Sequence, residues 1–165
     1  MKRLFIFLII FFTTTNLNAE QIIKYIDIDL ILKNSKGGKI IIEELKKIDS
    51  KNIQELKVKE IELKKLDEEI KKTTNIISET ELQIKIEDLK NKVSLYKKYQ
   101  KNKSNEFSKT KNEKIQAFFI NISPIIENYM KDNNISMLVD KKNIFIADSN
   151  YDITTQIIEI LDKQN

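Results

Sequence analysis

Residues 63–89 read LKKLDEEIKKTTNIISETELQIKIEDL, and this stretch decides the fold. Apolar residues recur every three or four positions in its first part and again in its last part, which is the spacing of one face of an α-helix. Between the two parts lie the weak helix formers at 73–75 and a capping box, Ser78-x-x-Glu81. The sequence therefore predicts that one helix ends and a second begins near residues 73–79.

The helical pattern extends in both directions from this turn. From Lys39 to Lys72 there is no glycine or proline, and the apolar residues that recur at seam spacing are Ile41, Leu45, Ile48, Leu56, Leu63, Leu66 and Ile70. After the turn the pattern continues through Leu82, Ile86, Leu89, Val93, Tyr96, Gln100, Lys103 and Phe107. A lone helix of 34 residues, about 51 Å long, would expose its apolar stripe, so the two helices are predicted to pair as an antiparallel coiled-coil hairpin. Four polar seam residues predict weak packing: Asn52, Lys59, Gln100 and Lys103.

Strand-like segments lie at both ends of the hairpin. Ile22–Ile28 alternates β-branched and aromatic residues with charged ones, and Ile135–Val139 and Ile144–Ala147 read as two further short strands. Short helical segments are predicted beside them, with caps at Asp29 and Ser35, and a final helix is expected to start at Asp152-Ile153-Thr154. Ser123-Pro124 is expected to kink or restart the return helix. The predicted fold class is α+β, mostly helical: a long hairpin arm on a small β-rich body.

The domain organisation follows from these elements. Residues 1–19 have the three-part layout of a secretory signal peptide, with Lys2 and Arg3, an apolar run too short to cross a bilayer, and cleavage expected after Ala19. Residues 20–38 form the first strand and short helix of the body, 39–112 the arm with its tip near 73–79, and 113–165 the rest of the body. Export to the periplasm is the expected localisation.

The composition excludes most enzyme chemistry. The chain has no histidine and no cysteine, which removes the usual general base, thiol nucleophile and soft metal ligands. Gly37-Gly38-Lys39 lacks the first glycine and the final Ser or Thr of a phosphate loop. We therefore expect no catalytic residue, cofactor or metal. Nucleic-acid binding is also not expected of an exported protein.

The predicted body is too small to support a stable monomer. Three short strands and a few helical turns bury little apolar surface, so several chains are expected to pack their small sheets together. The residues expected in this oligomerisation body are Ile22, Ile26, Ile28, Leu138, Val139, Ile144 and Ile146.

At its two ends the chain resembles the Skp/OmpH family of periplasmic chaperones. The resemblance lies in Ile23-Lys24-Tyr25-Ile26-Asp27, the Asn34–Lys39 segment, Ile135–Asp140, Ile144–Asp148 and Tyr151-Asp152-Ile153-Thr154. It implies a homotrimer in which a β-rich body holds three helical arms around a cavity. It also implies a holdase that keeps unfolded outer-membrane proteins in that cavity without ATP.

Two sets of arm residues are candidates for holding a client. Lys90 to Lys114 contains nine lysines against two glutamates, a basic surface that could attract acidic clients or anionic lipid headgroups, or else a solvated helix face with Glu–Lys pairs. Apolar residues outside the seams form the second set, which scattered surface hydrophobes would also explain. The candidates are Ile53, Val58, Ile61, Ile76, Ile77, Leu95, Tyr99, Lys90, Lys92, Lys97, Lys98, Lys101 and Lys103. The alternative function is a structural or adaptor coiled coil of the envelope that binds a folded partner.

Overall fold

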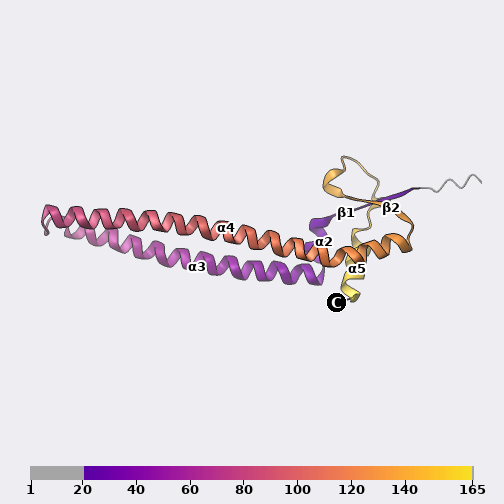
Figure 1. Cartoon of the computed structure of the whole chain (residues 1–165), viewed down its shortest axis with the longest axis horizontal. Coiled ribbons are helices and arrows are strands. Elements are labelled where there is room, and N and C mark those ends of the chain that lie inside the picture. The colour runs from indigo at the N-terminus through magenta and orange to yellow at the C-terminus, as the bar shows by residue number, and fades with distance from the viewer. Residues whose placement is uncertain (1–20, 165) are drawn as a thin grey trace, which may run out of the picture.

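A computed structural model describes residues 21–164 and places two long helices side by side along most of the molecule (Figure 1). Helix α3 spans Lys36–Thr73 and helix α4 spans Glu79–Asp132, so they run antiparallel and form one slender arm. At 1.5 Å per residue, α3 alone is about 57 Å long. The predicted fold class, α+β with a helical hairpin on a small β-containing body, is confirmed.

The chain reverses at residues 74–78 because both helix ends are satisfied locally. The hydroxyls of Thr73 and Thr74 donate to the carbonyl oxygen of Ile70, which ends α3. At the start of α4, the Ser78 Oγ accepts the backbone N–H of Glu81 at 3.3 Å, as its place in the capping box predicts. Acidic residues in the first turn of α4 and lysines in the last turn of α3 complement the two helix dipoles.

The body gathers segments from both ends of the chain. Strand β1 (Ile22–Ile26) pairs in parallel with β2 (Ile135–Asp140), and the carbonyl oxygen of Tyr25 accepts the N–H of Ile153. Helix α2 (Ile28–Asn34) and helix α5 (Thr154–Gln164) pack against each other and against the base of the arm. The buried core consists of Ile26, Ile31, Phe118, Ile122, Ile135, Ile153, Ile157 and Leu161.

The root of the arm is held tightly by its neighbours. The backbone N–H of Lys36 donates to the Asp162 carboxylate at 2.7 Å, and the Lys36 ammonium donates to the Asp162 carbonyl oxygen. Gly38 is buried, and a Cβ at this position would lie 1.9 Å from the carbonyl oxygen of Leu32. The glycine therefore permits close packing of α3 on α2.

Two local predictions are wrong. Ile144–Ala147 is not a strand, because it follows a 3-10 turn (Lys141–Asn143) and finds no pairing partner within residues 21–164. Asp27, not Asp29, caps α2, since its carboxylate accepts the N–H of Leu30 at 2.9 Å. Of the two outcomes expected at Ser123-Pro124, a kink or a restart of the helix, the restart does not occur, because α4 continues through Pro124 although proline has no N–H to donate. The helix beside that proline packs on the body core through Phe118 and Ile122, and this packing offsets the missing bond.

Candidate functional site

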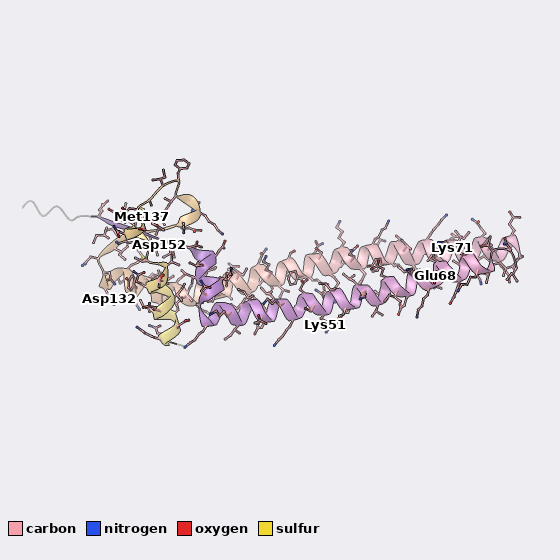
Figure 2. All side chains as sticks on the ribbon, turned by 180° about the vertical axis from the view of Figure 1, so that it is seen from behind. Lys51, Glu68, Lys71, Asp132, Met137 and Asp152 are labelled. Atoms are coloured by element: carbon pink, nitrogen blue, oxygen red, sulfur yellow. The ribbon has the colours of Figure 1, made fainter. Side chains whose placement is uncertain are left out.

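The arm is the largest exposed structure of the molecule, and its two helices meet along a narrow seam. Figure 2 shows side chains projecting from the arm along its whole length, with Lys51, Glu68 and Lys71 as labelled examples. Most predicted seam positions are half-buried, but Lys59 and Gln100 are exposed. Tyr99, predicted to lie outside the seam, is half-buried at it. Most residues near this part of the seam are polar, so the alternating four- and three-residue spacing does not show whether Tyr99 or its neighbour Gln100 faces α3. The contacts of the tyrosine ring place Tyr99 at the seam.

Tyr99 belongs to a polar cluster in the middle of the arm, which we call the mid-arm cluster: Glu55 and Lys59 of α3 with Tyr99 and Lys103 of α4. The Tyr99 hydroxyl donates to Glu55 Oε2 at 2.6 Å, and the Lys103 ammonium lies 2.9 Å from the same oxygen. The tyrosine ring lies between two ammonium groups, Lys59 at 4.9 Å and Lys103 at 5.5 Å from its centroid. These contacts connect the two helices.

The electrostatics of the cluster follow from these hydrogen bonds. The bond from Tyr99, and then the one from Lys103, holds the pKa of the Glu55 carboxyl below its ordinary value of 4.5. The Glu55 carboxylate in turn raises the pKa of the Tyr99 hydroxyl above 10.0 and that of the Lys103 ammonium above 10.5. At neutral pH the Glu55 carboxyl is therefore ionised, the Tyr99 phenol is neutral and the Lys103 amine is protonated.

Of the grooves along the arm, two flank the mid-arm cluster, one on each side. The base-side groove, of ≈ 480 Å³, lies between residues 49–56 of α3 and 97–107 of α4. The tip-side groove, of ≈ 430 Å³, lies between residues 59–66 of α3 and 92–99 of α4. Lys97 of the first groove and Leu95 of the second are two residues, or about 200°, apart around α4, whereas Lys103 and Tyr99, where the two grooves adjoin, are only about 40° apart.

The structure divides the predicted client-binding residues between these grooves and the open surface. Ile53, Lys97, Lys101 and Lys103 line the base-side groove, whereas Lys92, Leu95 and Tyr99 line the tip-side groove. Val58, Ile61, Ile76, Lys90 and Lys98 are exposed and line neither groove, and Ile77 is half-buried at the turn. Seven of the thirteen candidates thus line one of two grooves, and the other six lie outside both.

The body carries its own exposed apolar side chains. Phe145 is 98% exposed and Ile146 is 84% exposed, both in the segment that was predicted to be a strand. Ile23 of β1 and Met137 of β2 are opposite one another in the sheet and are both about half-exposed. Sequence reasoning missed Ile23, Met137 and Phe145, although the alternation along β1 places Ile23 on the face opposite Ile22.

The other predicted body residues are more enclosed. Ile26 is buried in the core of its own chain, and Ile22, Ile28 and Leu138 pack against that core. Val139 and Ile144 are half-buried. Of the predicted oligomerisation residues, Ile146 is thus the one that is most available to a neighbouring molecule.

Two acidic residues of the body, Asp27 and Asp29, have structural partners. Asp27 lies 3.8 Å from the ammonium of Lys141, and Asp29 lies 2.8 Å from that of Lys142, so these pairs connect the segment after β2 to helix α2.

Within residues 21–164, no group of three or more metal-binding side chains is placed to hold an ion. No helix in the same range is long and apolar enough to cross a membrane. The predicted signal peptide and its cleavage point lie outside the described residues.

Comparisons with known proteins agree on the fold. A family model described as outer membrane protein (OmpH-like) matches residues 22–161. This range includes both ends of the chain on which the sequence resemblance rests, so the match confirms the resemblance. A solved structure of a candidate outer membrane chaperone (OmpH-like) from Caulobacter crescentus CB15 is 18% identical in sequence. It superposes with a TM-score of 0.76 and covers 94% of this chain and 92% of its own. Among curated proteins, none matches this chain.

Proposed function

Because this chain belongs to the family of OmpH-like outer membrane proteins, we propose that it is an ATP-independent holdase chaperone of the periplasm. In this proposal it sequesters unfolded outer-membrane proteins between helical arms and acts by binding alone. The observation that carries the proposal is the arm itself. It is a slender helical hairpin, too thin to bury the apolar and basic side chains that it exposes along its length.

The arm's exposed side chains suit a client without fixed structure. Ile53, Val58, Ile61 and Leu95 are each about half-exposed or more, and lysines alternate with them on the surface. Each contact of this kind is weak, but many contacts together hold a chain while it remains free to reorient. Holding an unfolded chain in this way lowers its chance of aggregating, and release requires no nucleotide.

A cavity requires more than one arm, so we propose a homotrimer that assembles through the body. Two observations support assembly there. Among residues 21–164, the buried core cluster of a single body holds eight apolar residues, which is little for a chain of this length. In addition, the body exposes Phe145 and Ile146 almost completely. Three arms held at one common body would enclose the space for a client.

The test of the proposed function is an aggregation assay. A denatured outer-membrane porin is diluted into buffer with and without an excess of the purified protein, and turbidity is followed over time. We expect the protein to suppress aggregation without added ATP. Unchanged aggregation at an excess of trimers over porin would exclude the holdase function. Mass spectrometry of the exported protein tests the localisation, with an N-terminus at Glu20 expected.

A further inference from the structure

The base-side groove exists because the apolar seam of the arm is interrupted. On α3 the seam positions between Ile48 and Leu56 include the polar Asn52, and on α4 those between Tyr96 and Phe107 are polar or charged. The two helices therefore leave an opening of ≈ 480 Å³, a size typical of ligand sites in proteins. Leu56 and Phe107 are half-buried in its walls and provide apolar surface.

Two lysines at this groove have no carboxylate partner. Lys97 and Lys101 are exposed, stand one helical turn apart on the same face of α4, and make no ion pair within residues 21–164. Like charges at this spacing repel each other, and a bound anion would relieve the repulsion. Asp49 is the acidic residue that lines the groove, and the third lysine, Lys103, is already paired with Glu55. The lysines therefore leave the groove with an excess of positive charge.

The tip-side groove lacks this feature. Its lysines are engaged, since Lys92 lies 2.7 Å from the Asp88 carboxylate and Lys59 lies over the ring of Tyr99. Glu62 adds a negative charge to its lining. The two grooves therefore differ in the ligand that they favour, although their volumes are similar.

We propose that the base-side groove binds extended segments of unfolded polypeptide in which an acidic residue stands next to an apolar one. Lys97 and Lys101 take the carboxylate, and the walls formed by Leu56 and Phe107 contact the apolar side chain, with Ile53 at the rim. This inference rests on the proposed holdase function and adds the class of client segment that one part of the arm selects.

A single thiol at the groove wall tests the site directly, because the chain contains no cysteine. Ser104→Cys places the thiol in the groove, and Asn102→Cys places it at the same height but about 200° around α4. The probe is a short peptide of alternating Asp and Phe, and the comparison peptide alternates Lys and Phe. With the acidic peptide at ten times its Kd, a neutral thiol reagent should modify Ser104→Cys about tenfold more slowly. The rate at Asn102→Cys should stay unchanged.

Affinity provides the second measurement. Replacing both free lysines, Lys97→Gln with Lys101→Gln, should raise the Kd for the acidic peptide about threefold to tenfold, which is what two exposed ion pairs contribute. The control, Lys64→Gln with Lys65→Gln, removes the same charge from exposed positions of α3 outside both grooves and should leave the Kd unchanged.

Each contrary result has a definite meaning. Equal loss of affinity in the control, or equal protection of both thiols, would show a general charge effect and overturn the site. Protection by vesicles of anionic lipid but not by the peptide would also overturn it. The porin assay separates this inference from the proposed function. If wild-type protein suppresses aggregation but does not bind the acidic peptide, the groove assignment fails and the holdase function stands.

Discussion

Tyr99 and Glu55, which are 44 residues apart in sequence, are joined across the arm by a hydrogen bond of 2.6 Å from the tyrosine hydroxyl to the carboxylate. The bond lies where the apolar seam is interrupted, between the base-side groove and the tip-side groove. Together with Lys59 and Lys103 it connects α3 to α4 in a part of the arm that has few apolar contacts. We therefore expect the mid-arm cluster to hold the two helices together locally.

The first prediction concerns the local stability of the arm. Tyr99→Phe removes the hydroxyl but keeps the ring, so the Glu55 carboxylate loses one of its two donors. Amide hydrogen exchange in residues 50–60 and 95–105 should become about threefold to tenfold faster, the range that one hydrogen bond contributes. Exchange in the body core should not change.

A cross-arm pair nearer the body is the matched control for that variant. Lys114 lies 2.7 Å from Glu44, and this pair has no aromatic ring or second donor. Glu44→Gln should change mid-arm exchange little, because exposed ion pairs contribute little. If Glu44→Gln and Tyr99→Phe accelerate mid-arm exchange equally, the cluster has no special role.

The second prediction is a pH dependence of the cluster. The pKa of Glu55 is lowered in the folded arm, so its contribution to stability is present above 4.5 and is lost as pH falls through the lowered value. The pKa values of Tyr99 and Lys103 are raised, so their contributions are present below 10.0 and 10.5 and are lost as pH rises through the raised values. The cluster should therefore stabilise the arm most between about pH 5 and pH 9.

Thermal unfolding followed by circular dichroism measures this dependence. The difference in Tm between wild-type protein and Glu55→Gln should be largest near neutral pH and should shrink as the pH falls below 4.5. Lysines also lower the carboxyl pKa values of Glu43 and Glu44. Both residues are present in both proteins, so the Tm difference reports the contribution of the mid-arm cluster alone. A Tm difference that does not vary with pH would contradict the prediction.

Much of the arm could be predicted from sequence because its determinants are local. The four–three spacing of apolar residues and the Ser78 cap act over a few residues, and they place the turn without knowledge of the rest of the chain. The polar seam positions also predicted weak packing, and the base-side groove is found where Asn52 and Gln100 interrupt the seam. Sequence alone could not show that Tyr99 would turn toward Glu55, since that depends on the register of the two helices.

The body was harder to predict because its determinants are distant in sequence. Ile144–Ala147 has strand-like residues, but a strand also requires a partner, and none of residues 21–164 provides one. The cap at Asp27 was missed because Asp29 is equally suitable by composition. In the fold Asp29 instead pairs with Lys142, 113 residues further along the chain.

The third prediction concerns the root of the arm. Gly38→Ala should destabilise the protein, because the added Cβ would meet the backbone carbonyl of Leu32, which cannot move aside as a flexible side chain can. The neighbouring glycine is the control. Gly37→Ala should be neutral or should stabilise by up to about 1 kcal/mol, since alanine favours the helix more than glycine does. Chemical denaturation measures both variants, and equal stability of the two would contradict the close packing at Gly38.

The fourth prediction tests assembly through the body. The segment that carries Phe145 and Ile146 is fixed at both ends. Before it, Lys141 pairs with Asp27 and Lys142 pairs with Asp29. After it, the carbonyl oxygen of Asn150 accepts a hydrogen bond from the Lys24 ammonium. Two apolar side chains held this way in water favour contact with another copy of the chain. Phe145→Asp should therefore shift the proposed trimer towards monomers in light scattering, because an unpaired carboxylate would be buried at the contact.

The tip of the arm provides the control for this variant. Ile76→Asp makes the same kind of change at a residue that is 80% exposed but far from the body, and it should leave the subunit number unchanged. A trimer that survives Phe145→Asp would place the contact elsewhere on the body, for example at Ile23 and Met137. A wild-type protein that is monomeric and stably folded in dilute solution would contradict the trimer itself, and with it a cavity enclosed by several arms.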